Sequence, residues 1–306
     1  MPENTQTEFR IGIDLGGTKI EAVALGPDGS VAHKKRVPTP REDYRGTVTA
    51  VVDVIAALES ELGQKATLGM GIPGTISPHT GRIKNANATW LNDTSFAQDL
   101  VQALGRRLRV ENDANCFALS EARDGAARGA RVVFGVIVGT GTGGGIVVGG
   151  NIWRGANAVA GEWGHNPLPS PTKDEFPGPD CYCGCRGCVE TFLSGPGLAR
   201  DYEVMTGRRF EPPVIIKMAD RGEPEAVEAL ARYEDRMARG LSSVINLLDP
   251  DVIVLGGGLS NIDRLYTNVP NLWSRYVFSD NVSTRLLRAE HGDSSGARGA
   301  ARLWEI

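Results

Sequence analysis

Residues 131–148 read RVVFGVIVGTGTGGGIVV, an apolar run, a glycine-rich break and a second apolar run. The same layout opens the chain, where residues 9–25 read FRIGIDLGGTKIEAVAL. Runs of β-branched and aromatic residues interrupted by glycine are typical of two strands joined by a tight loop. Because the pattern occurs twice, we predict a duplicated α/β architecture with one strand–loop–strand unit in each of two lobes.

Strand and helix patterns alternate in the segments around these two units. A buried strand at 251–255 ends in a third glycine loop, and the Gly/Pro-rich stretch 168–179 is typical of an insertion or flexible loop. The alternation predicts a layered α/β fold. The remaining predicted elements are strands at 30–37, 67–72 and 109–111 and helices at 48–62, 96–104, 114–122 and from Pro224 onwards.

Length and composition narrow the class of protein. The 306 residues suit two domains, and 41% hydrophobic with 23% charged residues is ordinary globular usage. The formal net charge is −4, so we expect no nucleic-acid surface. No apolar run approaches the length of a membrane span, about 18 residues. The polar residues 1–8 lack the apolar stretch of a signal peptide, so we expect a cytoplasmic protein.

The glycine loops are typical of phosphate binding, since backbone N–H groups there can approach an anion without a Cβ in the way. Residues 12–19 resemble a P-loop, but Thr18 and Lys19 stand in the wrong order and a strand follows. Residues 139–144 fit G-x-G-x-x-G, but again a strand rather than a helix follows, which argues against a dinucleotide site. Asp14, beside the first loop, offers oxygen ligands for Mg²⁺. A turn without any ligand is the alternative interpretation of each loop.

Cysteine is clustered. Four of the five cysteines, Cys181, Cys183, Cys185 and Cys188, fall within eight residues. In a reducing compartment such clustering indicates a metal site before it indicates disulfides.

Five motifs follow one another along the chain: DLGGTK at 14–19, ENDAN at 111–115, the glycine run at 139–145, GEWGH at 161–165 and C-x-C-G-x-x-G-C-x-E at 181–190. In this order they resemble the ROK-family sugar kinases of the sugar kinase, Hsp70 and actin superfamily, and the resemblance covers nearly the whole chain. The stretches MGIPG at 70–74, KNAN at 84–87 and HGDSSG at 291–296 resemble, within the family, fructokinases and manno(fructo)kinases.

The resemblance implies a two-lobed, actin-like (ribonuclease H-like) fold with duplicated α/β domains around a cleft. The small lobe would be 1–118, with a C-terminal helix at about 293–306 packing back on it. The large lobe would be 119–292, with a zinc-binding segment at 165–188. The residues implied to bind ATP and Mg²⁺ are Asp14, Gly16, Gly17, Thr18, Lys19, Gly139, Thr140, Gly141, Thr142, Gly143, Gly256, Gly257 and Gly258.

Asp113 is the candidate catalytic base. A sugar hydroxyl is a poor nucleophile at neutral pH, and a carboxylate at a strand end can accept its proton. The alternative from the sequence alone is that Asp113 caps the helix that follows. The residues that the resemblance implies for sugar binding are Gly81, Asn87, Asn112, Asp113, Glu162, His165 and Glu190.

The cysteine cluster and His165 match the family's structural zinc site. Cys181, Cys183 and Cys188 with His165 would give four N/S ligands, the number structural Zn²⁺ prefers. One ring nitrogen of His165 would bind zinc and the other would point at the sugar. A four-cysteine site including Cys185 and the absence of any metal are the alternatives.

Together these residues predict an ATP- and Mg²⁺-dependent hexose kinase that phosphorylates D-fructose, and D-mannose, on O6. The alternative within the family is a glucokinase or a kinase of N-acetylglucosamine or N-acetylmannosamine. The alternative from another class is a non-catalytic sugar-sensing protein. The expected partners are a hexose and ATP, with a possible homodimer and neither nucleic acid nor membrane.

Overall fold

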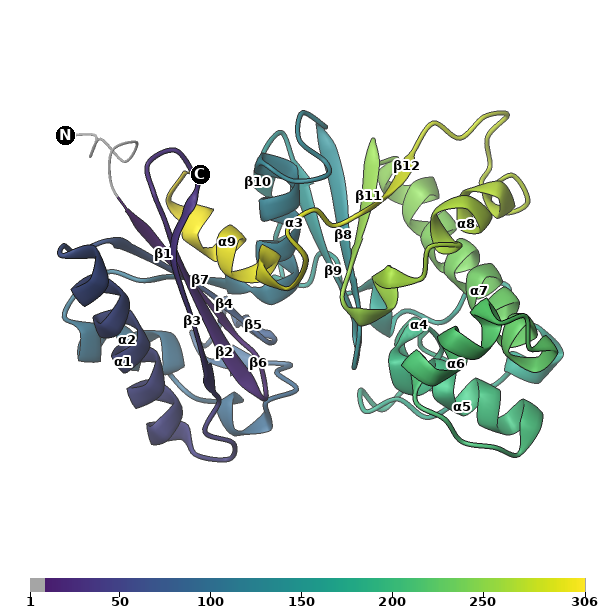
Figure 1. Cartoon of the computed structure of the whole chain (residues 1–306), viewed down its shortest axis with the longest axis horizontal. Coiled ribbons are helices and arrows are strands. Elements are labelled where there is room, and N and C mark those ends of the chain that lie inside the picture. Colours follow the sequence, from purple (N-terminus) through teal and green to yellow (C-terminus); the bar gives the residue numbers. More distant parts are fainter. Residues whose placement is uncertain (1–8, 306) are drawn as a thin grey trace. The chain divides into compact units, whose positions relative to one another are not determined.

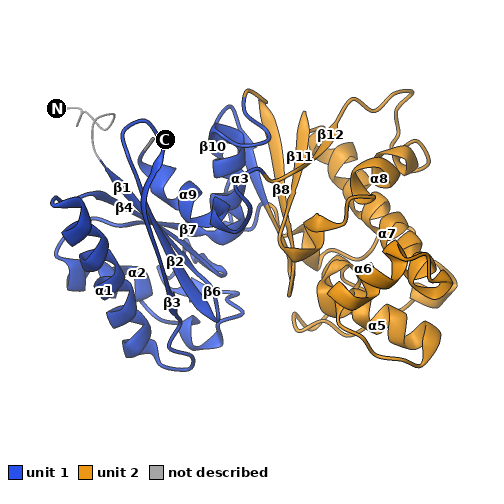
Figure 2. Ribbon diagram, in the orientation of Figure 1, with its two compact units in different colours: residues 1–128, 145–160, 290–306 blue, residues 129–144, 161–289 orange. Residues whose placement is uncertain are grey.

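The computed structural model describes residues 9–305. These residues form two compact units, drawn in blue and orange in Figure 2. Unit 1 comprises 9–128, 145–160 and 290–305, and unit 2 comprises 129–144 and 161–289. The division differs from the one expected at residue 118, because residues 145–160 group with the first unit.

Unit 1 is built on a five-stranded sheet of order β3-β2-β1-β4-β7. The first three strands form an antiparallel meander, and β1, β4 and β7 run parallel. The elements of the unit are β1 (Arg10–Leu15), β2 (Lys19–Leu25), β3 (Val31–Pro38), α1 (Tyr44–Leu62), β4 (Thr67–Ile72), β5 (Thr75–Ile76), β6 (Ile83–Lys84), α2 (Phe96–Leu104), β7 (Arg109–Asn112), α3 (Asp113–Arg123), the second part of β9 (Thr142–Val148), β10 (Asn151–Ile152) and α9 (Ser295–Ala301).

The core of unit 1 lies between the sheet and the helices α1 and α2. Ile11 and Ile13 of β1, Val51 and Leu58 of α1 and Phe96 of α2 are all buried in it. These side chains recur with a period of two along the strand and at helical spacing along α1. The periodic segments found in the sequence are thus the segments that make the core.

The C-terminal helix α9 packs on the sheet of unit 1, where Figure 1 shows it in yellow beside β1. Gly12 of β1 and Gly69 of β4 are partners in the strand register. A Cβ at Gly12 would lie 1.9 Å from the Ala297 carbonyl oxygen, and one at Gly69 would lie 1.8 Å from that of Ala300. Only glycine allows this approach, so Gly12 and Gly69 permit the backbone of α9 to pack directly on β1 and β4.

Unit 2 is built around parallel strands in which β11 lies between β8 and β12. The sheet containing them has the order β10-β9-β8-β11-β12, which repeats the order of the first sheet. This repetition agrees with the duplicated architecture predicted from the two strand–loop–strand units. The elements of the unit are β8 (Val132–Val138), the first part of β9, α4 (Val189–Leu193), α5 (Gly195–Thr206), α6 (Pro212–Asp220), α7 (Pro224–Leu248), β11 (Val252–Gly256), α8 (Leu265–Trp273) and β12 (Arg285–Arg288).

The Gly/Pro-rich stretch 168–179 is held in place by the long helix α7. The buried Glu175 carboxylate accepts hydrogen bonds from Arg236 at 2.7 Å and Arg239 at 2.8 Å. Burial alone would raise the pKa of Glu175, but these two guanidinium groups lower it to about 2. The sequence predicted an insertion or a flexible loop here. The buried ion pairs that hold the stretch in place could not be predicted, because the spacing of Glu175 from Arg236 and Arg239 follows no local pattern.

Most expected elements are present, with two local differences. β9 begins at Thr142, so half of the glycine run is strand rather than loop. The alternative interpretation of Asp113 as a helix cap is wrong: α3 begins at Asp113, one residue before the predicted helix, and Asn112 is its N-cap. Among residues 9–305, no helix combines the length and the apolar character needed to cross a membrane.

Candidate active site

The carboxyl ends of three parallel strands bring the acidic residues of unit 1 to one edge of the sheet. Asp14 of β1 is the register partner of Gly71 in β4, and Ile72 of β4 is the partner of Asn112 in β7. Asp113 follows directly as the first residue of α3. Ligands of open α/β sheets bind at such carboxyl ends, so this edge is the candidate site of unit 1.

Asn112 fixes the start of α3 and contacts Asp113. Its Oδ1 accepts the backbone N–H of Asn115 at 3.1 Å, and its Nδ2 donates to the Gly74 carbonyl and to Asp113 Oδ1, both at 3.0 Å. Asp113 Oδ1 also accepts the backbone N–H of Ala114 at 2.8 Å. The carboxylate is therefore held in one orientation by a backbone donor and a side-chain donor, as a general base requires.

Asp14 lies close enough to Asp113 for their charges to interact. Burial, and then the Asp113 carboxylate, raise the pKa of Asp14 to about 7. Lys19, at the start of β2, acts in the opposite direction. Two carboxylates that cannot both ionise freely form a site that favours a divalent cation, and the oxygen ligands suit Mg²⁺.

The glycine loop beside Asp14 is closed by backbone bonds within unit 1. The Gly16 N–H donates to the Lys19 carbonyl at 2.9 Å, and Thr39 Oγ1 donates to the Gly16 carbonyl at 2.7 Å. Gly17 and Thr18 lie between these anchors, and the ammonium of Lys19 pairs with Asp293 at 3.2 Å. The predicted residues 16–19 are therefore adjacent to Asp14 in the chain and form one short loop.

Gly81 and Asn87 lie around the β5–β6 hairpin of the same unit. Gly81 has a φ of 69° and donates its N–H to the Ser77 carbonyl at 2.9 Å. Asn87 is exposed, and its neighbour Ala86 is fixed by two hydrogen bonds of 2.9 Å with the side chain of Asn92. The hairpin follows Gly74, whose carbonyl accepts from Asn112, so it is tied to the base through that bond.

In unit 2, the other two glycine loops line one cavity of about 1140 Å³. Gly139 and Thr140 follow β8, and Gly258 follows β11. A Cβ at Gly257, which has a φ of 82°, would lie 2.4 Å from the Val138 carbonyl oxygen, so glycine is needed for the two loops to meet. The structure thus brings together the residues predicted for nucleotide at 139–140 and 258.

The remaining wall of this cavity comes from α5 and α6, which were not predicted to take part. Pro196, Pro212 and Ile216 give it apolar surface, and the Gly195 N–H donates to the Gly139 carbonyl at 2.7 Å. The available signal was the pair of proline-started helices after the cysteine motif, Gly195-Pro196 and Pro212-Pro213. A large cavity with an apolar wall and exposed glycine backbone suits a nucleoside phosphate.

Glu162, His165 and Glu190 all belong to unit 2. Glu162 precedes a short 3-10 helix, Trp163–His165, which is anchored by the buried Trp163 through its Nε1 donation to the Gly143 carbonyl at 3.3 Å. Glu190 Oε2 accepts the backbone N–H of Thr142 at 2.9 Å. Glu190 is therefore bonded to the glycine loop, a contact that the sugar-binding role predicted for it did not include.

Tyr182 is a neighbour that the sequence did not single out. Its hydroxyl lies 3.0 Å from His165 Nε2, and its ring meets the imidazole edge-on with centroids 5.1 Å apart. Burial raises the pKa of Tyr182, and the nearby Glu190 and Glu162 carboxylates raise it further. The ring nitrogen of His165 that was expected to face the sugar thus contacts this phenol.

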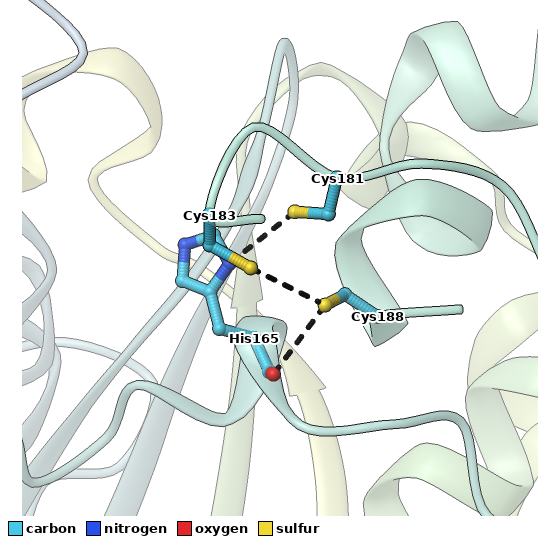
Figure 3. Close-up of side chains that lie close together, drawn as sticks. All are labelled: His165, Cys181, Cys183 and Cys188. Atoms are coloured by element: carbon cyan, nitrogen blue, oxygen red, sulfur yellow. Dashed lines mark hydrogen bonds between the residues drawn. The ribbon is translucent and has the colours of Figure 1, made fainter. Parts of the chain in front are cut away.

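Four side chains of unit 2 form a candidate metal centre, drawn in Figure 3. The ligand atoms of His165, Cys181, Cys183 and Cys188 all lie within 4.8 Å of one another. Cys183 Sγ is 3.7 Å from Cys188 Sγ, and Cys181 Sγ is 3.6 Å from His165 Nδ1. Tetrahedral Zn²⁺ with ordinary bond lengths would separate two sulfurs by about 3.8 Å and a sulfur from a nitrogen by about 3.6 Å.

These distances and the donor set fit zinc. The backbone N–H of Cys185 is the largest influence that lowers the pKa of Cys183 to about 7, which favours the thiolate a metal needs. Cys185 itself is exposed and lies outside the group, so the four-cysteine alternative finds no support here. The four residues named from the sequence are those that the structure brings together.

Comparison with known proteins places the chain in a family. The sequence pattern of the ROK family matches residues 10–306. The chain belongs to the ROK family. A solved ROK hexokinase from Thermus thermophilus superposes with a TM-score of 0.84 at 33% identity, covering 96% of each chain. A ROK glucokinase from Streptomyces griseus, solved with glucose and AMPPNP, gives a TM-score of 0.80 at 28% identity over 96% of this chain and 98% of that one.

A curated ROK relative, the N-acetyl-D-glucosamine kinase of Photobacterium profundum, is 38% identical over 296 residues, which is 95% of this chain and 98% of that protein. The predicted actin-like α/β fold is therefore confirmed, and the chain is a sugar kinase of the ROK family. The prediction of a fructokinase is not confirmed, since curated relatives of this chain are named N-acetyl-D-glucosamine kinase.

Proposed function

We propose that this ROK protein phosphorylates N-acetyl-D-glucosamine on O6 with ATP. The observation that carries the choice of sugar is the full-length similarity to kinases named for that sugar. A kinase of N-acetylglucosamine was among the alternatives to the fructokinase that the sequence predicted. Motifs common to the family do not distinguish hexoses, which explains why they do not decide between fructose and N-acetylglucosamine.

Asp113 takes the proton of the acceptor hydroxyl in this reaction. Its carboxylate is oriented by the Ala114 N–H and by Asn112 Nδ2, which both donate to Oδ1. Asn112 in turn is fixed by its bonds to Gly74 and Asn115, which makes it a rigid neighbour for a sugar hydroxyl. A base placed this way contributes about 10² to 10⁴ in rate.

The cavity of unit 2 holds the nucleotide. Its apolar wall suits the adenine ring, and the exposed backbone at Gly139, Thr140 and Gly258 suits phosphate oxygens. The loop in unit 1 would add the backbone N–H groups of Gly17 and Thr18, whereas the Gly16 N–H already donates to the Lys19 carbonyl. Phosphoryl transfer depends mostly on such positioning and on charge neutralisation.

Two metal ions fit the residues present. Asp14 would hold Mg²⁺, directly or through water, and that ion neutralises phosphate charge when bound. His165, Cys181, Cys183 and Cys188 would hold a structural Zn²⁺, which fixes the segment that carries Tyr182 and Glu190. Glu162 and Glu190 offer acceptors for sugar hydroxyls beside that segment. The homodimer stays a prediction.

The test is an ADP-release assay with ATP and Mg²⁺ across N-acetylglucosamine, N-acetylmannosamine, glucose, mannose and fructose. We expect kcat/KM for N-acetylglucosamine to exceed that for fructose at least tenfold. A tenfold preference for fructose or glucose would overturn the sugar assignment, and no ADP release with any of the five would overturn the kinase. The Asp113→Asn variant, purified in the same way, controls for contaminating kinases.

A further inference from the structure

The Glu111 carboxylate is buried directly before Asn112 and Asp113, and none of the roles above uses it. Its side chain is 3% exposed. Glu111 Oε1 accepts the backbone N–H of Asn112 at 2.9 Å and the Asn115 Nδ2 at 3.1 Å. Glu111 therefore contacts the two asparagines that flank the catalytic base in the chain.

The other oxygen of Glu111 is taken by a residue from a distant part of the sequence. Glu111 Oε2 accepts a hydrogen bond from Arg154 Nε, and the two side chains form an ion pair. Arg154 is the second residue of the segment 153–160, which follows β10 and also belongs to unit 1. Both carboxylate oxygens are thus occupied by three donors of three different kinds.

The segment 153–160 is itself fixed at several points. The Trp153 N–H donates to the Ile146 carbonyl at 2.8 Å, and the Ala160 N–H donates to the Arg154 carbonyl at 3.2 Å. Lys84 of β6 donates to the Asn157 carbonyl at 2.9 Å. The backbone that carries Arg154 is therefore fixed, so the ion pair connects Glu111 to an ordered segment.

A buried carboxylate is stable only with matching donors, and it holds those donors in return. The Asn112 N–H and the Asn115 amide have no freedom to turn while Glu111 accepts from both. Asn112 Nδ2 donates to Asp113 Oδ1 at 3.0 Å, so the position of Asn112 determines the position of the Asp113 carboxylate. A shift of the Glu111 carboxylate is thereby passed to the base, where a misplacement of about 1 Å can cost about 10²-fold in rate.

We propose that Glu111 and Arg154 are positioning residues for Asp113. Glu111 sets the orientation of the Asn112–Asp113 pair, and Arg154 fixes Glu111 and compensates its charge. The proposal rests on the proposed function only in taking Asp113 as the base of a sugar kinase.

Three variants test the pair: Glu111→Gln, Arg154→Met and the double variant. We expect each single variant to lower kcat by 10- to 100-fold with the KM for the sugar changed less than threefold. The double variant is expected to lose about as much as one single variant, because the residues act together. Arg154→Lys keeps the charge and should recover part of kcat.

The pH profile of kcat/KM separates positioning from a loss of stability. Arg154→Met leaves the Glu111 charge uncompensated near Asp113, which favours the protonated base and moves the acidic limb to higher pH. Glu111→Gln leaves the Arg154 charge uncompensated and moves that limb to lower pH. Asp14 on β1 and the buried Cys116 thiol on α3 also interact electrostatically with Asp113, and every variant retains both.

Arg106→Met is the matched control. Arg106 pairs with Glu59, another carboxylate of unit 1 that is only 7% exposed and that also accepts a backbone N–H, that of Ala66. We expect this variant to lose unfolding free energy like Arg154→Met while its kcat and pH profile stay within twofold of the wild type. Equal kinetics in Arg154→Met and Arg106→Met, or limbs that move in the same direction in both single variants, would overturn the proposal.

The wild type is assayed first, which keeps this inference separate from the proposed function. If it phosphorylates none of the five sugars, the proposed function fails before any variant is measured. If it phosphorylates one of them, the variants are measured with that sugar. Should Glu111→Gln not fold, Arg154→Met decides alone, because the Arg154 side chain is 56% exposed and its removal leaves a smaller defect.

Discussion

The Oε2 atom of Glu190 accepts a hydrogen bond of 2.9 Å from the backbone N–H of Thr142. This contact joins the helix after the cysteine motif to the glycine loop after β8. A Cβ at Gly141 would lie 2.6 Å from the same carboxylate oxygen, so glycine there is what permits the contact. Glu190 stands two residues after Cys188, and it therefore links the candidate metal centre to the loop that lines the nucleotide cavity.

Replacing Glu190 with alanine should raise the KM for ATP as well as the KM for the sugar, each about tenfold or more. The reason is the loss of a hydrogen bond to a charged acceptor, worth about 1.5–3 kcal/mol, at the base of the glycine loop. Steady-state kinetics with each substrate varied in turn measures both constants. Glu228→Ala, an exposed change on α7, is the control. An unchanged KM for ATP would show that Glu190 serves the sugar alone.

The acidic edge of unit 1 could be predicted because local sequence determines it. Asp14 and Asn112 stand at the carboxyl ends of β1 and β7, Asp113 directly follows β7, and parallel strands bring such ends to one edge of the sheet. The clustering of the cysteines indicated a metal site, and the resemblance to the family implied its four ligands, which the structure places within 4.8 Å of one another. In both cases a short motif carries most of the geometry.

The remaining parts of the site depend on contacts between distant segments. Arg154 meets Glu111 across 43 positions of the chain, and no periodicity in either segment encodes that pairing. The glycines at 12 and 69 have strand-like neighbours, and only the packing of α9 explains why they lack side chains. The α5–α6 wall of the cavity was missed for the same reason, because the prolines at the starts of these helices indicate helices but not that they pack beside the glycine loops.

Asp113→Asn should lower kcat by about 10² to 10⁴ and leave sugar affinity within a few-fold of the wild type. The amide keeps an oxygen that can accept from Ala114 N–H, but it cannot take a proton from the acceptor hydroxyl. Calorimetric sugar binding and the ADP-release rate measure the two quantities separately. Asp99→Asn on α2 is a control of the same chemical change. A variant that retains more than a tenth of the wild-type kcat would remove Asp113 as the base.

We expect the purified protein to contain one equivalent of zinc, bound at the candidate metal centre. Cys183→Ser should reduce zinc to well below half an equivalent and lower Tm, because a structural site needs all four ligands. Cys185→Ser changes the exposed thiol beside it and should retain full zinc and full Tm. Metal analysis and thermal unfolding provide the readouts. Equal zinc loss in both variants would favour a site that includes Cys185.

The raised pKa of Asp14 predicts a pH-dependent stability. An acid whose pKa is higher in the folded protein holds its proton more tightly there, so the free energy of unfolding falls as pH rises from about 4 to about 7 and is level above that range. Asp14→Asn removes this titration. The variant should match the wild type near pH 4, become progressively the more stable protein as pH rises to about 7, and keep that advantage above it.

Urea unfolding at several pH values, without metal or nucleotide, measures this difference. Asp293→Asn is the matched control, because the Asp293 side chain lies near Asp14 but is 72% exposed and should show no such trend. A stability difference between Asp14→Asn and the wild type that stays constant from about pH 4 to about pH 8 would mean that the Asp14 carboxylate is not held protonated by burial and by Asp113. Added Mg²⁺ should reduce the difference by stabilising only the wild type, since a bound cation favours the ionised carboxylate.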